Sequence, residues 1–114
     1  LEDIQTKTKD EIMEYYNNLS ENLGVSFFPP ENVINMVAWG RFNSNRHEEA
    51  FEFFEMNIKN YPLSNKVYEM IGYAYNNAGN KDEAIKYFKK SLELNSNENE
   101  KSRINELINE LIKG

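Results

Sequence analysis

The most constraining feature of this sequence is an internal repeat with a period of 34 residues. When residues 31–64 are aligned with residues 65–98, residues of similar size fall at matching offsets. The matched pairs are Ile34 with Tyr68, Val37 with Ile71, Ala38 with Gly72, Ala50 with Ala84, and Phe54 with Phe88. Small residues let two helices approach closely, and an aromatic residue fills the space that remains. The repeat therefore predicts two copies of an antiparallel helix pair.

Each copy has the apolar periodicity of two helices. In the second copy the two apolar stretches are Val67, Met70, Ile71, Ala74, Tyr75 and then Ala84, Ile85, Phe88, Leu92. In the first copy they are Val33, Ile34, Val37, Ala38 and then Ala50, Phe51, Phe54, Ile58, with Pro62 ending the second helix. Gly79 suits the loop between the helices of the second copy, and Asn80 suits the start of the next helix. On that helix we expect Asp82 and Lys86 to pair on the solvent side.

Two repeats are fewer than a stacked array needs, so flanking helices are expected to cover both ends. Upstream, Thr8 and Glu11 have the spacing of a capping box. The apolar stripe of that helix is Ile12, Tyr16, Leu19 and Leu23, followed by Gly24, and Pro29-Pro30 favours an extended path after it. Downstream, Ile104, Leu107, Ile108 and Leu111 form a last amphipathic stripe. We therefore divide the chain into residues 1–30 (capping helix and linker), 31–98 (repeats 31–64 and 65–98) and 99–114 (capping helix).

These patterns predict an all-α fold, an α-α superhelix of two helix pairs with a capping helix at each end. The 114 residues suit a single domain and carry 13 basic against 19 acidic side chains. A net charge of -6 argues against a nucleic-acid surface, and no apolar run approaches the roughly 18 residues of a membrane span. The absence of cysteine excludes disulfides and thiolate metal sites. No cofactor and no metal are expected.

No serine in the sequence lies in the Gly-x-Ser-x-Gly setting of a hydrolase nucleophile. His47 is the only histidine, and the acidic residues after it indicate a solvated first turn of a helix rather than a catalytic base. The alternating Asn95, Asn97 and Asn99 imitate a calcium loop, but Glu100 occupies the place that requires glycine. The chain by itself is therefore predicted not to be an enzyme.

The second copy resembles a tetratricopeptide repeat. The matching residues are Tyr68, Ile71, Gly72, Tyr75, Gly79, Ala84 and Phe88, with Ser91 in place of alanine and Ser96 in place of proline. The first copy keeps Ala38, Ala50, Phe54 and Pro62 but has Arg41 for tyrosine, Asn45 for glycine and Asn57 for alanine. The resemblance covers residues 31–98 and implies a module for contact with proteins or peptides.

In this family the first helix of each repeat lines a concave face, and its ninth position points into that face. The resemblance assigns Trp39 and Tyr73 to the ninth position. The other candidate partner-binding residues lie one turn further along and are Phe42, Asn43, Asn76 and Asn77. Aromatic rings and amides suit an extended peptide. The alternative is that Trp39 and Phe42 are covered by the upstream helix or by Phe27-Phe28. For a basic clamp on a terminal carboxylate, only Lys66 and Arg103 are near suitable positions.

A second resemblance covers nearly the whole chain. The segments Glu14–Gly24, Pro30–Asn35, Asn60–Tyr68 and Ala78–Lys86 are similar to the helical tail of bacterial α/β-hydrolase esterases of the iron-siderophore and esterase D type. Similar tails follow serine β-lactamase-like hydrolases. The resemblance, together with a first residue that is Leu1 rather than Met, implies a non-catalytic C-terminal accessory domain of a bacterial hydrolase.

In that case the partner is the attached catalytic domain or a second copy of the chain. The alternative is a freestanding adaptor that binds a peptide on its concave face. Neither resemblance distinguishes a cytoplasmic from an exported protein.

Overall fold

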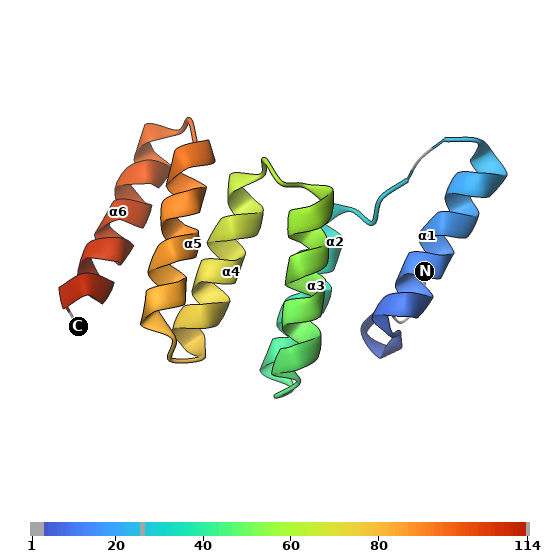
Figure 1. Cartoon of the computed structure of the whole chain (residues 1–114), viewed down its shortest axis with the longest axis horizontal. Helices are drawn as coiled ribbons and strands as arrows, with labels where there is room; N and C mark the ends of the chain where they lie inside the picture. The colour runs from blue at the N-terminus through green and yellow to red at the C-terminus, as the bar shows by residue number, and fades with distance from the viewer. Residues whose placement is uncertain (1–3, 26, 114) are drawn as a thin grey trace. The chain divides into compact units, whose positions relative to one another are not determined.

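The computed structural model describes residues 4–25 and 27–113, and these residues form helices and no strands. The elements are η1 (Ile4–Thr6), α1 (Lys9–Leu23), α2 (Glu31–Asn43), α3 (His47–Asn60), α4 (Asn65–Asn77), α5 (Lys81–Leu94) and α6 (Glu98–Lys113) (Figure 1). The predicted all-α helical repeat is confirmed. The chain comprises two compact units, Leu1–Asn60 and Tyr61–Gly114, which are described separately. No described helix is long and apolar enough to span a bilayer.

The residues paired by the 34-residue period occupy equivalent buried positions in the two units. In the first unit Ala38 on α2 and Phe54 on α3 are fully buried. In the second unit Gly72 lies so close to Phe88 that a Cβ atom at Gly72 would be 2.7 Å from the ring. Each helix pair therefore closes around a small residue and an aromatic residue, as the repeat predicts.

Two departures from the family pattern have the same structural role. Asn57 and Ser91 replace alanine, and both are fully buried. The Asn57 Nδ2 donates to the carbonyl oxygen of Glu31 at 3.0 Å, and the Ser91 Oγ donates to the carbonyl oxygen of Asn65 at 2.9 Å. Because both donors and both acceptors are 34 residues apart, each bond ties the second helix of a pair to the first turn of its partner.

Helix α1 begins and ends as predicted, but it buries less than predicted. Both hydrogen bonds of the Thr8–Glu11 capping box are present, and Gly24 ends the helix with a φ of 69°. Of the expected apolar stripe, Ile12 is fully buried, whereas Leu23 is 59% exposed. The expected stripe is therefore wrong for the last turn of α1.

Arg41, which corresponds to Tyr75 in the 34-residue register, is buried in the first unit. Its guanidinium lies 5.0 Å from the centre of the Phe53 ring and donates to the carbonyl oxygens of Ile4 and Lys7. A salt bridge of 3.4 Å joins it to Glu49. Arginine at this position therefore holds the segment around η1 against the first helix pair. In the second unit the equivalent contact is a stack of two tyrosine rings, Tyr75 on Tyr87.

In the second unit, α6 packs against α5 through an apolar cluster. Its fully or nearly fully buried members are Ala84, Phe88, Ile104 and Ile108. The predicted loop before α5 is confirmed, with Gly79 at a φ of 84° and the Asn80 side chain accepting a hydrogen bond from the Glu83 amide.

The expected pairing of Lys86 with Asp82 is wrong. The Lys86 Nζ lies 3.9 Å from the carboxylate of Glu83 instead. A spacing of three residues brings two side chains together on a helix as well as a spacing of four does.

The calcium-like segment before α6 acts as a helix start. The Asn95 Oδ1 accepts a hydrogen bond from the Asn97 amide, and the Asn97 Oδ1 accepts one from the Glu100 amide. These side-chain oxygens satisfy backbone donors that the first turn of a helix leaves unpaired.

Candidate peptide-binding surface

Tyr73 of the second unit is held at both ends of its side chain. Its ring meets the ring of Phe88 edge to face, with 5.2 Å between the centres and 78° between the planes. Its hydroxyl oxygen accepts a hydrogen bond of 2.7 Å from the Arg103 Nη1. The rest of the ring is partly exposed. Tyr73 therefore presents a fixed aromatic surface on α4 rather than a mobile one.

Arg103 is engaged within the second unit through Glu69. The Arg103 Nη2 lies 3.1 Å from the carboxylate of Glu69, whose side chain is only 3% exposed. Burial lowers the pKa of Arg103, but the hydrogen bond and the charge of Glu69 raise it by more, so that the pKa lies above its ordinary value. The guanidinium thus stays charged and forms an ion pair with Glu69. Lys66, the other residue considered for a clamp on a terminal carboxylate, lies at the start of α4 and is exposed.

The amide residues of α4 lie at its C-terminal end. Asn76 is half-buried and Asn77, the last residue of the helix, is exposed. An exposed side-chain amide carries both a donor and an acceptor, which is what the backbone of an extended peptide requires. Asn77 is therefore the more accessible hydrogen-bonding group of the two.

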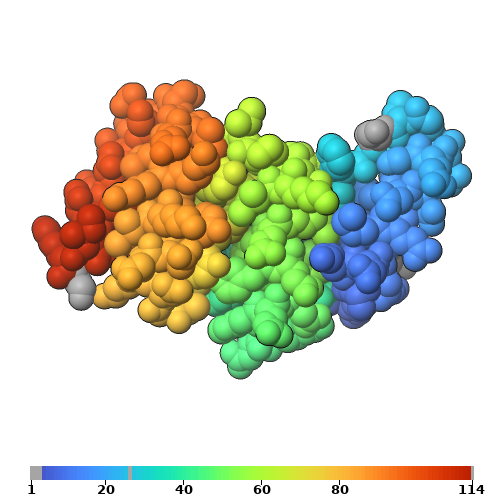
Figure 2. Space-filling view, viewed as in Figure 1, coloured from blue at the N-terminus to red at the C-terminus, as the bar shows by residue number. Residues whose placement is uncertain are grey.

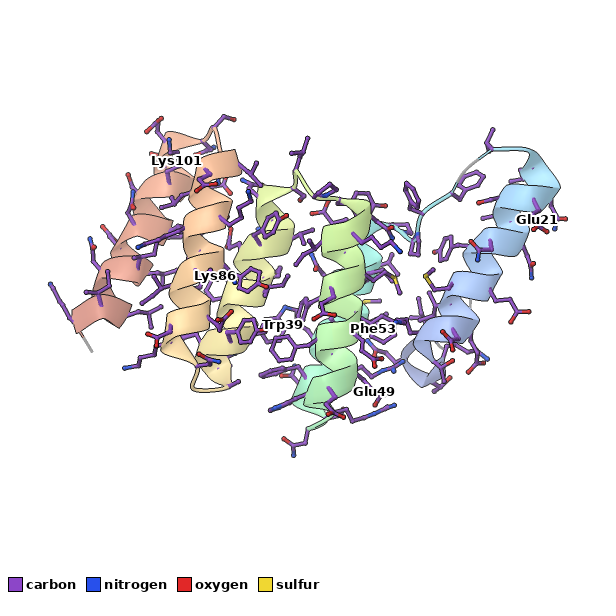
Figure 3. All side chains as sticks on the ribbon, in the orientation of Figure 1. Glu21, Trp39, Glu49, Phe53, Lys86 and Lys101 are labelled. Atoms are coloured by element: carbon purple, nitrogen blue, oxygen red, sulfur yellow. The ribbon has the colours of Figure 1, made fainter. Side chains whose placement is uncertain are left out.

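In the first unit, Trp39 packs against aromatic rings of α2 and α3. It meets Phe54 edge to face at 5.8 Å and 80°, and Phe42 at 5.3 Å and 66°. Figure 3 labels Trp39 among the side chains around α2 and α3. Trp39 is half-buried, so part of its ring remains accessible.

Phe42 offers little surface to a partner, because it is only 7% exposed. Its ring stacks on that of His47, with 4.2 Å between the centres and 9° between the planes. His47 itself is exposed in the first turn of α3, as expected. Asn43, the last residue of α2, is exposed. Phe42 therefore supports Trp39 from the side, and Trp39 and Asn43 are the accessible candidates of this unit.

The two units repeat the same aromatic geometry. Trp39 with Phe54 and Tyr73 with Phe88 are equivalent pairs in the 34-residue register, and both are edge-to-face contacts. The structure gathers Trp39, Phe42 and Asn43 on α2, and Tyr73, Asn76 and Asn77 on α4. That the two sets form one binding surface stays a prediction.

The contact between Glu69 and Arg103 is the part of this site that the sequence analysis missed. The 34-residue register holds a signal for it, because it places Arg103 of α6 at the position equivalent to Glu69 of α4. Equivalent positions of successive repeats lie on corresponding faces, so opposite charges there can pair.

The geometry of these residues suits recognition of a bound chain. Among residues 4–25 and 27–113, no group of three or more acidic or histidine side chains is placed to hold a metal ion. Partly exposed rings on rigid helices, with amides beside them, provide stacking and backbone hydrogen bonds for a bound chain.

Comparison with known proteins supports the repeat family within the second unit. Residues 66–98 match the family model of the tetratricopeptide repeat. No curated protein and no solved structure matches the chain. Nothing in the comparisons supports the resemblance to hydrolase tails. The segment 66–98, which spans α5 and all of α4 but its first residue, is thus similar to a tetratricopeptide repeat, the kind of repeat that generally mediates contacts between proteins.

Proposed function

We propose that this chain is a non-catalytic interaction domain that binds peptide segments of a partner protein through the aromatic and amide residues of α4 in the second unit and through the equivalent residues of α2 in the first. The observation that carries the proposal is the repeated aromatic geometry. Trp39 and Tyr73 are each held edge-on by a phenylalanine of the following helix, and each keeps part of its ring accessible. Rigid aromatic side chains lose little conformational entropy on binding, which makes them effective contact residues.

The charges around Tyr73 favour a peptide without a required terminal carboxylate. Arg103, the cation nearest to Tyr73, already pairs with the buried carboxylate of Glu69. A peptide carboxylate at this place would have to displace Glu69 and leave a buried charge unpaired. At α4 the peptide is therefore recognised by its side chains on the ring of Tyr73 and by its backbone on Asn77.

Selection from a displayed library of random dodecapeptides tests the proposal. Peptides enriched on the wild-type chain are synthesised, and their affinities are measured by the fluorescence of Trp39, the single tryptophan. Tyr73→Ala should weaken binding about tenfold or more, which is typical of an aromatic contact at the centre of an interface.

Tyr15→Ala is the matched control, because Tyr15 is an exposed tyrosine on α1 outside the proposed surface. It should change the affinity less than twofold. The proposal is wrong if no peptide is enriched, or if both variants weaken binding equally while circular dichroism shows both to be folded.

The resemblance to hydrolase tails adds a finer proposal, that the domain is attached to a catalytic domain of a bacterial hydrolase. It rests on the sequence segments Glu14–Gly24 and Asn60–Tyr68 together with the others of that resemblance. The intact mass of the natural protein tests it. A mass larger by a whole catalytic domain would support attachment, whereas a mass near 13.4 kDa would support the freestanding adaptor.

A further inference from the structure

The second unit has a groove that the proposed peptide surface does not use. It has a volume of about 670 Å³, and all its lining residues come from α4 and α5. Three of them are the lysines Lys86, Lys89 and Lys90, two are the acidic residues Asp82 and Glu93, and the others are Tyr68, Ile85 and Tyr87. We call this site the lysine–tyrosine groove. Figure 2 shows the surface of α5 in orange beside that of α4 in yellow.

The groove has an aromatic floor with ammonium groups over it. The rings of Tyr68 and Tyr87 stack with 6.4 Å between their centres and 18° between their planes. The Lys86 Nζ lies 5.6 Å from the centre of Tyr87, and the Lys90 Nζ lies 5.9 Å from the centre of Tyr68. Lys86 extends from α5 in Figure 3. Tyr68 is only 7% exposed, so a ligand here would meet the partly exposed ring of Tyr87 together with positive charge.

The lysines of the groove are only weakly held by their own helix. Lys86 lies 3.9 Å from Glu83, and Lys90 lies 3.6 Å from Glu93. The Lys86 and Lys90 side chains are 69% and 47% exposed. Exposed pairs of this kind contribute little to stability, so they can be exchanged for the carboxylates of a partner. Lys89 is exposed as well.

In the first unit, the equivalent residues of the repeat share a groove with helix α1. There the equivalent residues of α3 line a groove of about 250 Å³ whose other lining residues include Lys9 and Met13 of α1. The lining residues from α3 are Glu52, Glu55, Met56, Lys59 and Asn60. A helix with a charged and an apolar residue four positions apart therefore forms the opposite wall.

At three matched positions the two grooves carry charges of opposite sign. In the 34-residue register, Glu52 corresponds to Lys86, Glu55 to Lys89, and Lys59 to Glu93. In the groove of the first unit, α3 contributes Glu52 and Glu55, and α1 contributes the cation of Lys9. The same position in the second unit presents lysines, so electrostatic complementarity calls for an anion where α1 supplies Lys9.

We propose that the lysine–tyrosine groove binds an acidic amphipathic helix of a partner protein. The helix places a Glu or Asp beside Lys86 and Lys89 and, four residues away, an apolar side chain on the partly exposed ring of Tyr87. This is the arrangement of Lys9 and Met13 on α1 with the sign of the charge reversed. The site is separate from Tyr73 and does not depend on the proposed peptide surface.

Fluorescence anisotropy with a designed helical peptide tests this proposal. The probe is a fluorescein-labelled peptide of about four turns that carries Glu and Leu four residues apart along one face. Lys86→Glu/Lys89→Glu should weaken its binding about tenfold or more, because attraction is replaced by repulsion. Lys66→Glu/Lys113→Glu makes the same change of net charge at exposed residues outside the groove and should weaken binding less than about threefold.

Three results would overturn the proposal. The probe does not bind the wild-type chain at millimolar concentration, or both charge-reversal variants lose affinity equally, or replacing every Glu of the probe by Gln leaves its affinity unchanged. If circular dichroism shows the groove variant to be unfolded, Lys86→Gln/Lys89→Gln repeats the test without added repulsion and should weaken binding several-fold. Tyr73→Ala should leave the affinity for this probe unchanged, which separates this site from the peptide surface.

Discussion

Gly72 provides the sharpest test of how the second helix pair closes. A Cβ atom at this position would lie 2.7 Å from both Cδ1 and Cε1 of Phe88, whereas ordinary contacts begin near 3.4 Å. The Phe88 ring is fully buried in the cluster that α5 shares with α6, so it has little freedom to move away. We therefore predict that Gly72→Ala destabilises the second unit although alanine favours helices.

The expected magnitude follows from two opposing effects. Forcing an extra methyl group into a packed core costs about 1–3 kcal/mol, and replacing glycine by alanine inside a helix returns about 1 kcal/mol. The net loss should be about 1 kcal/mol. Gly72→Leu should cost several kcal/mol, because the larger side chain has to separate α4 from α5. In a Phe88→Leu background the clash is relieved, so Gly72→Ala should become stabilising.

Gly40→Ala is the matched control on α2. A Cβ atom there would lie 2.5 Å from the side chain of Gln5, but that side chain is exposed and can swing into solvent. The substitution loses the exposed hydrogen bond from Gln5 to the carbonyl oxygen of Met36, worth about 0.5 kcal/mol. After the helix-propensity gain, Gly40→Ala should stabilise the first unit by about 0.5 kcal/mol.

Urea unfolding followed by circular dichroism measures both changes. The fluorescence of Trp39 is recorded alongside, because it reports on the first unit alone and reveals whether the two units unfold together. The reasoning is refuted if Gly72→Ala raises the free energy of unfolding in the wild-type background. It is also refuted if Gly72→Ala is equally destabilising with leucine at position 88, because the ring would then not be the cause.

Three further predictions concern peptide binding, the pH dependence of stability and the hydrogen bond from Ser91 to Asn65. Trp39→Ala should abolish capture of the selected peptides while circular dichroism stays that of a folded chain; loss of the helical signal would instead make Trp39 a core residue. Hydrogen bonding from Arg46 lowers the pKa of Glu49, so its contribution to stability is complete above about pH 4.5 and is lost as the pH falls through the lower folded-state pKa. Thermal midpoints of the wild type and Glu49→Gln should therefore converge in acid, and a constant difference would contradict this. Ser91→Ala should cost about 1 kcal/mol in urea unfolding, because the hydrogen bond from the fully buried Ser91 to the carbonyl oxygen of Asn65 is lost; an unchanged midpoint would contradict this.

Much of the fold is predictable because its signals are local. The capping box of Thr8 and Glu11 and the left-handed turn at Gly79 depend on residues within a few positions of each other. The register of Ala38 and Gly72 follows from a period that runs through both helix pairs. In each case the backbone geometry is decided by neighbours in the sequence, so the pattern alone indicates it.

The candidate site was predictable only in part. The aromatic positions Trp39 and Tyr73 follow from the repeat, but their exposure does not. Phe42 belongs to the same helix face as Trp39 in the sequence pattern, yet it is buried because His47 of the next helix stacks on it. Whether an aromatic residue of a helix packs or stays accessible depends on which side chains the following helix brings against it.

The sequence by itself determined where the helices begin and end and which residues of each pair face each other. Only the tertiary structure decided the partners of the charged and polar side chains. Arg41 holds the segment around η1, and Arg103 is drawn to the buried Glu69. Helix boundaries depend on backbone dihedrals and contacts within one turn, whereas an ion pair depends on the distance between helices that are far apart in the chain.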